Sequence, residues 1–172
     1  MKVVVNDANI LIDLVKLQLL PHFFGLGWEY HTTSLIFDEL YEDQQEAFAP
    51  YQDKGIFIVA DLDAEELGLV LEMQIEKPQL SEQDCSALFY TMKTSGILLS
   101  SDKNLRDFAE NKKVDVHGHL WIFDAMVAQK CISHTRAAEK LEELINAINP
   151  KLRLPDHECK RRIGLWRKDK HS

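Results

Sequence analysis

Two acidic residues stand directly after short apolar runs of the chain. Asp7 follows Val3–Val5 after one asparagine, and Asp102 follows Ile97–Leu99 after two serines. An apolar run of this kind is typical of a buried strand in a parallel sheet, and ligands bind in the crevice beyond the carboxyl ends of such strands. The sequence therefore predicts that these two carboxylates lie at one ligand-binding edge.

Two further acids are candidates for the same edge. Glu39 interrupts the apolar stripe of a helix predicted to begin at Thr33 or Ser34, with no Lys or Arg three or four residues away. A carboxylate on a buried stripe is costly unless it is paired or bound to a cation. Asp84 falls in the first turn of a helix that Ser81 opens. Both carboxylates are therefore candidates for a cation site.

Four carboxylates gathered at one edge would need a cation among them, because several close negative charges do not all stay ionised. Oxygen ligands without His or Cys at suitable spacing favour Mg²⁺ or Mn²⁺ over Zn²⁺. The chain has no Walker loop, dinucleotide fingerprint or nucleophile elbow, so the cluster indicates metal-assisted phosphoryl chemistry on a phosphodiester. Each acid also has a structural alternative: Asp7 and Asp102 could cap the helices that follow them, and Ser81 with Asp84 resembles a capping box.

Strands alternate with helices along the chain, which favours a parallel sheet covered by helices on both faces. We predict an α/β fold, a three-layer α/β/α sandwich with a central parallel sheet of about five strands. The expected strands are residues 2–6, 28–32, 56–59, 97–100 and 114–117. The expected helices are residues 8–20, a helix carrying Leu35 to Leu40, 64–75, 81–94, 104–111, 120–129, 135–148 and a basic helix after residue 155. The stretch 43–54 reads as polar, with no element assigned.

The chain has 172 residues, 45% of them hydrophobic, which is the size and apolar content of one globular unit. Three widely separated cysteines indicate neither a disulfide framework nor a zinc site, and a reducing cytoplasm fits best. No basic leader precedes an apolar segment at the start, and no apolar run approaches the roughly 18 residues of a membrane span, so we expect no membrane partner. The net charge of −8 divides into +5 for residues 151–172 and −13 for the rest.

Four segments, in chain order, resemble the PIN domain family. They are VVVNDANILIDL around Asp7, SLIFDEL around Glu39, LSEQDCSALFYT around Asp84 and LLSSDKNLRDFA around Asp102. Residues 117–145, HGHLWIFDAMVAQKCISHTRAAEKLEELI, resemble the C-terminal half of PIN-like proteins of the toxin–antitoxin type. The resemblance covers most of the chain and implies a PIN-like catalytic domain over residues 1–150, with residues 151–172 as a basic helical extension packed on it.

The resemblance also implies roles for single residues. The four acids Asp7, Glu39, Asp84 and Asp102 would be catalytic and would bind Mg²⁺ or Mn²⁺. Three residues next to the acids would support them as metal ligands: Asn9, Ser101 and Asp107. Two basic residues would contact substrate phosphates: Lys103 and Arg106. For Asp107, capping or solvating the helix after Asp102 is the alternative.

The function implied by the resemblance is metal-dependent hydrolysis of phosphodiester bonds in single-stranded or structured RNA. The protein would be the cytoplasmic toxin of a type II toxin–antitoxin pair, with an antitoxin protein as partner and a homodimer as its assembly. One alternative is a PIN-fold module that binds RNA or protein without cutting. A phosphatase with Asp7 as nucleophile would need a second Asp where Asn9 stands.

Two other groups of residues have competing interpretations. His117 and His119 could form a catalytic pair, but the sequence favours polar turn residues because no carboxylate is adjacent to them. Basic residues of the last helix, including Lys160, Arg162 and Arg167, interleave with apolar ones. This helix could follow RNA phosphates, dock on an acidic partner or form a solvated terminus.

Overall fold

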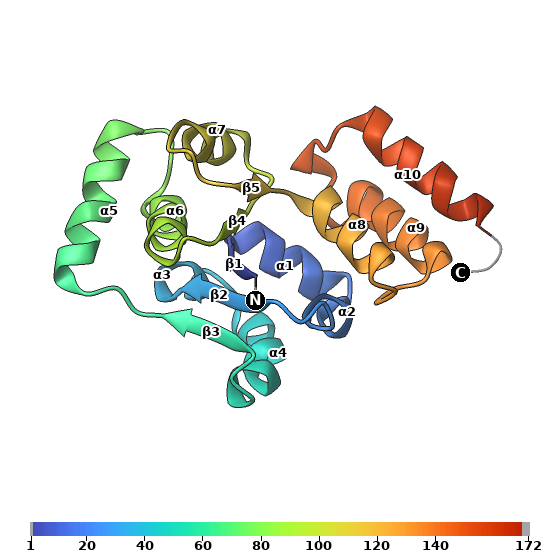
Figure 1. Cartoon of the computed structure of the whole chain (residues 1–172), viewed down its shortest axis with the longest axis horizontal. Helices are drawn as coiled ribbons and strands as arrows, with labels where there is room; N and C mark the ends of the chain where they lie inside the picture. Colours follow the sequence, from blue (N-terminus) through green and yellow to red (C-terminus); the bar gives the residue numbers. More distant parts are fainter. Residues whose placement is uncertain (1, 170–172) are drawn as a thin grey trace. The chain divides into compact units, whose positions relative to one another are not determined.

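The computed structural model describes residues 2–169, and its centre is a five-stranded, all-parallel sheet (Figure 1). The spatial order of the strands is β3-β2-β1-β4-β5. Their bounds are β1 Val3–Asn6, β2 Glu29–Thr33, β3 Phe57–Ala60, β4 Ile97–Leu99 and β5 Val116–His117. With helices flanking this sheet, the predicted α/β class with about five parallel strands is confirmed.

The pairing of β1 with β4 brings the two predicted strand ends together. In this pair Asn6 lies opposite Leu99, and the Asp7 N–H donates to the Leu99 carbonyl over 3.1 Å. The chain order reverses at β1, whose neighbours β2 and β4 follow it in sequence on opposite sides. Crevices at such a reversal are where open parallel sheets bind ligands. The register thus places Asp7 beside the segment that leads to Asp102.

The helices alternate with the strands as their caps and apolar faces predict. Their bounds are α1 Ala8–Lys16, α2 Leu20–Phe24, α3 Ser34–Phe37, α4 Glu42–Asp53, α5 Ala64–Glu76, α6 Glu82–Thr94, α7 Lys103–Asn111, α8 His119–Ala128, α9 His134–Glu143 and α10 Asp156–Lys168. A π-helical turn, η1, covers Leu144–Ile148, and a 3₁₀ turn, η2, covers Pro150–Leu152. No helix within residues 2–169 has the length and apolar character needed to cross a bilayer.

The described residues group into two compact units. The first contains residues 2–12 and 28–117, which include the whole sheet, and the second contains residues 13–27 and 118–169. Helix α1 contributes its residues up to Ile12 to the first unit and the remainder to the second. The division predicted at residue 150 falls within the second unit and stays a prediction.

Helix α6 is the main cover of the sheet in the first unit. It packs against β1, β2 and β4, and Cys85, Ala87 and Leu88 on it are fully buried. Helix α5 packs against α6, and Val70 is its one buried residue. Because α6 is fixed against three strands, its first turn is held at the edge where β1 and β4 end.

One helix boundary differs from its prediction. The first helix ends at Lys16 rather than near Leu20, because Gln18 has a left-handed φ of 59°. Leu20 instead begins α2, and Pro21 lies in its first turn, where the missing N–H costs no hydrogen bond.

The polar stretch 43–54, left without an element, forms helix α4. The Gln44 side chain accepts from the Tyr41 N–H over 3.0 Å, and this contact fixes the helix start. Only Gln44 and Phe48 of α4 are buried, and the Phe48 ring stacks on Phe57 with centroids 4.9 Å apart. One buried aromatic residue thus anchors a helix whose sequence has no continuous apolar face.

Candidate functional site

Asp7 is a buried carboxylate at the end of β1. It is 4% exposed, and its Oδ1 accepts the Ile10 N–H over 3.0 Å, so it caps the start of α1. Its other oxygen, Oδ2, accepts a short hydrogen bond from the Ser100 hydroxyl. Both oxygens of Asp7 are therefore held in fixed directions.

Ser100 joins the two strand-end acids and was not singled out from the sequence. It is fully buried, and its Oγ accepts the Asp102 N–H over 3.1 Å while its hydroxyl donates to Asp7. Asp102 in turn caps α7, with its Oδ1 accepting the Leu105 N–H over 2.8 Å. Ser101, the serine predicted to support the acidic ligands, is partly exposed. Ser100 stands directly after the apolar run Ile97–Leu99, and that position was the signal by which the sequence could have identified it.

Asp84 is held by the capping box at the start of α6. Its Oδ2 accepts the Ser81 N–H over 3.1 Å, and its own N–H donates to the Ser81 Oγ over 3.0 Å. This reciprocal pair satisfies two backbone donors at the helix start. Asp84 therefore has the helix-capping role given above as its structural alternative. Asp7 and Asp102 also cap helices.

Glu39 differs from its prediction, because it is not on a buried helical stripe. Helix α3 is a single turn capped by Thr33, and it ends at Phe37. Glu39 lies in the turn that follows and is exposed, with its N–H bonded to the Ile36 carbonyl over 3.0 Å. Partial burial, and then the nearby negative charge of Asp84, raise the pKa of the Glu39 carboxyl.

The four acids and Asn9 line one open cleft of about 570 Å³, together with Ala8, Ile12 and Ser81. Four separate segments of the first unit supply the acids: the ends of β1 and β4, the turn after α3 and the first turn of α6. The other predicted site residues are not among those lining it. Lys103 and Asp107 are exposed on α7, while Arg106 and Ser101 are partly exposed. The roles of all these residues stay predictions.

Three of the four acids in the cleft have no basic partner among the described residues. Within residues 2–169, Glu39, Asp84 and Asp102 form no ion pair with Lys, Arg or His. Carboxylate, hydroxyl and amide oxygens are the donors that Mg²⁺ and Mn²⁺ prefer. In that same range, no three His, Cys, Asp or Glu side chains could hold a metal ion as they stand. The donor chemistry fits a hard cation, and binding would require the carboxylates to draw together.

Comparison with known families decides the classification. The PIN domain family model matches residues 3–168, nearly the whole chain. The chain belongs to the PIN domain family. Among curated proteins, no relative matches it significantly. PIN domains are generally nucleases and usually use divalent metals such as Mg²⁺, which agrees with the acidic cleft of this one.

Glu39→Gln is expected to raise the melting temperature of this PIN domain slightly at neutral pH, by about 1 °C. A carboxyl whose pKa is raised on folding destabilises the native state once the pH exceeds its unfolded value, so stability falls as pH rises through that window. The variant removes this loss, and its advantage should vanish at pH values below the ordinary glutamate pKa. Thermal melts between pH 4 and 8 measure the difference; an equal gain at every pH would contradict the assignment.

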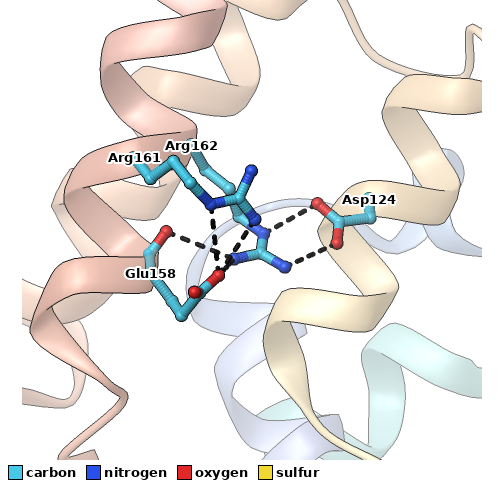
Figure 2. A network of polar contacts seen from close by, with 4 residues as sticks. All are labelled: Asp124, Glu158, Arg161 and Arg162. Atoms are coloured by element: carbon cyan, nitrogen blue, oxygen red, sulfur yellow. Dashed lines mark hydrogen bonds and ion pairs between the residues drawn. The ribbon is translucent and has the colours of Figure 1, made fainter.

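The cations of the C-terminal helix are largely used within the second unit. Arg162 makes a bidentate pair with Asp124 on α8, both N···O distances being 2.8 Å, and also contacts Glu158 (Figure 2). Arg161 pairs with the same Glu158 over 2.9 Å. Two further pairs, Lys160–Asp156 and Arg167–Glu142, engage the remaining cations named for this helix. These contacts favour a structural use of the basic charge over contact with RNA.

Each of the two histidines near β5 lies beside a carboxylate of its own unit. His117 pairs with Asp115 over 2.9 Å in the first unit. His119 begins α8 in the second unit, is 2% exposed, and its Nε2 lies 2.8 Å from Asp13 Oδ2. His119 is therefore a buried structural residue of this PIN domain rather than a residue of an exposed turn.

Proposed function

We propose that this PIN domain is a metal-dependent ribonuclease that hydrolyses phosphodiester bonds of single-stranded or structured RNA. The observation that carries the proposal is the cleft itself: four carboxylates from four segments line one open space, and Glu39, Asp84 and Asp102 form no ion pair with a basic side chain of residues 2–169. A cation bound among these like charges would offset their mutual repulsion. At Glu39, partial burial and then the charge of Asp84 raise the pKa of the carboxyl.

Each acid has a defined part in the proposal. Asp7, Asp84 and Asp102 would hold one or two Mg²⁺ or Mn²⁺ ions, since each keeps its carboxylate oriented by capping bonds. A bound ion would supply Lewis-acid stabilisation of the charge that develops on the phosphate and its leaving 3′-oxygen. Glu39, whose pKa is raised, is suited to orient the attacking water and take up its proton. The expected products carry 5′-phosphate and 3′-hydroxyl ends.

The test is cleavage of labelled single-stranded RNA by the purified protein. Cleavage in the presence of Mg²⁺ or Mn²⁺ that stops with a chelator, with 5′-phosphate products, supports the proposal. A wild-type protein that shows neither cleavage nor a rise in melting temperature with Mn²⁺ overturns it, because a ligand that binds the native state must stabilise it.

A non-cutting PIN-fold module for RNA or protein is the second candidate, and one observation favours it. Asp7, Asp84 and Asp102 all cap helices, so each has a structural role without a metal. RNA binding that is unchanged by a chelator, without cleavage, would identify this module.

Lys103 and Arg106 are proposed as phosphate contacts, because they follow Asp102 on α7 and form no ion pair among the described residues. In an inactive Asp102→Asn background, Lys103→Ala should weaken RNA binding and reduce the slope of log K against log salt by about 1. Lys160→Ala is the control, since Lys160 is exposed on α10 and paired with Asp156. Fluorescence anisotropy at several salt concentrations measures both. An equal loss in the control would contradict a specific role for α7.

The biological setting is proposed from the family resemblance. Residues 117–145 resemble PIN-like toxins, which supports a cytoplasmic role as the toxin of a type II pair, with an antitoxin partner and a homodimeric assembly. Co-expression with the product of an adjacent short reading frame, followed by size-exclusion chromatography, tests both associations. If expression of this protein stops cell growth and co-expression of that product restores it, the toxin role is supported.

A further inference from the structure

We propose that Thr33 and Ser86 are positioning residues that hold Glu39 and Asp84 at a working distance through a bridge of two buried hydroxyls. The inference rests on the proposed function, because it concerns how the acids of the cleft are kept ready for a cation. Neither residue lines the cleft, so both would act through the segments that carry the acids.

The bridge connects the cap of α3 to the first turn of α6. The Thr33 Oγ1 and the Ser86 Oγ are 2.7 Å apart, and both residues are fully buried. The Thr33 hydroxyl oxygen accepts the Ile36 N–H over 3.3 Å, and the Ser86 hydroxyl donates to the Gln83 carbonyl over 2.7 Å. Helices α3 and α6 pack against one another around this contact.

The hydrogen bond between the two hydroxyls can have only one direction of donation. A serine hydroxyl has a single hydrogen, and that of Ser86 is given to the Gln83 carbonyl. Its oxygen must therefore accept from Thr33, whose own oxygen accepts from the Ile36 N–H. Each of the two hydroxyls in the bridge donates one hydrogen bond and accepts one, so the bridge needs no water to complete it.

Both ends of the bridge lead directly to an acid of the cleft. The Ile36 carbonyl accepts the Glu39 N–H over 3.0 Å, so the cap of Thr33 on Ile36 also sets the turn that carries Glu39. Gln83 precedes Asp84 in the first turn of α6. The two hydroxyls are therefore a buried link between the segments that present the two carboxylates.

The link opposes the repulsion between two like charges in one cleft. Asp84 and Glu39 both line that cleft, and neighbouring carboxylates repel one another. Glu39 lies in an exposed turn after a helix of one turn, and the Gln45 side chain ties this turn to α4 by donating to the Phe37 and Leu40 carbonyls. Without the bridge, the α3 turn could relax away from α6, and the two carboxylates would separate.

The experiment compares Mn²⁺ binding in three variants of the whole protein by calorimetric titration. Thr33→Val and Ser86→Ala break the bridge, while Thr91→Val is the matched control. Thr91 is also a buried hydroxyl on α6, donating to the Ala87 carbonyl over 2.7 Å, but it is remote from the cleft lining. Melting temperatures without metal report the structural cost of each change separately.

We expect Thr33→Val and Ser86→Ala to weaken Mn²⁺ binding by about 10-fold, the usual size of an effect from residues that support metal ligands. Thr91→Val should lower the metal-free melting temperature by a similar amount and leave Mn²⁺ affinity unchanged. Thr33→Ser, which keeps the hydroxyl, should retain wild-type affinity. If the bridge variants bind Mn²⁺ as tightly as the control, the inference is wrong; if the wild type binds none, the proposed function fails instead.

Discussion

Replacing Asp102 by Asn is expected to reduce metal-dependent RNA cleavage by at least ~100-fold and to abolish the stabilisation by Mn²⁺. The substitution removes one negative charge from the cleft but keeps a good helix cap, since asparagine caps as well as aspartate. The hydrogen bond from the Leu105 N–H to the side-chain oxygen can therefore persist, and the fold should be preserved. Cleavage rates and thermal melts with and without Mn²⁺ measure the two effects.

Asp63→Asn provides the matched control for that result. Asp63 caps α5 in the same way, its Oδ1 accepting the Glu66 N–H over 2.8 Å, and it does not line the cleft. Its substitution should leave cleavage and the Mn²⁺ response unchanged. If Asp102→Asn cleaves RNA as well as Asp63→Asn does, Asp102 is only a cap and the non-cutting module becomes the better description.

Asp13→Ala is expected to lower the free energy of unfolding by about 3 kcal/mol. Asp13 is 2% exposed, and its Oδ2 lies 2.8 Å from His119 Nε2 and accepts from Asn149 Nδ2 over 3.0 Å. One carboxylate thus ties α1 to the start of α8 and to the residue that follows η1. Removing it takes an acceptor from two polar side chains at once.

Urea unfolding followed by circular dichroism measures the loss. Asp13→Asn should cost much less, because the amide oxygen can still accept from one of the two donors. Asp156→Ala serves as the surface control, since its pair with Lys160 is exposed on both sides and contributes little. A change for Asp13→Ala no larger than that of Asp156→Ala would show that the buried network is unimportant.

Much of the fold was predictable because its signals are local. Short apolar runs predicted the strands, and Ser81 and Asp102 begin helices as capping residues should. The errors arose where a distant contact decides the local structure. Helix α4 depends on Phe48 stacking against Phe57 of β3, and no pattern within residues 43–54 reports that partner.

Glu39 shows the same limit within the site. Its apolar neighbours suggested a buried helical stripe, yet the helix ends after one turn and leaves the carboxylate exposed. The sequence selected Glu39 together with the three acids that line the cleft beside it. The reason for selecting it, a place on a buried helical stripe, was wrong. Its raised pKa comes from partial burial and from Asp84, a residue far along the chain.

The sequence by itself determined the parallel α/β class, the family resemblance and the four acids, because strand periodicity, capping and motif spacing are properties of neighbouring residues. Only the tertiary structure decided that these acids share one cleft, that the Ser100 hydroxyl donates to Asp7, and that Arg162 of α10 pairs with Asp124 within the second unit. Such facts depend on which strands pair and which helices pack together. Strand pairing and helix packing depend on the free energy of the whole chain, and a local sequence pattern does not report them.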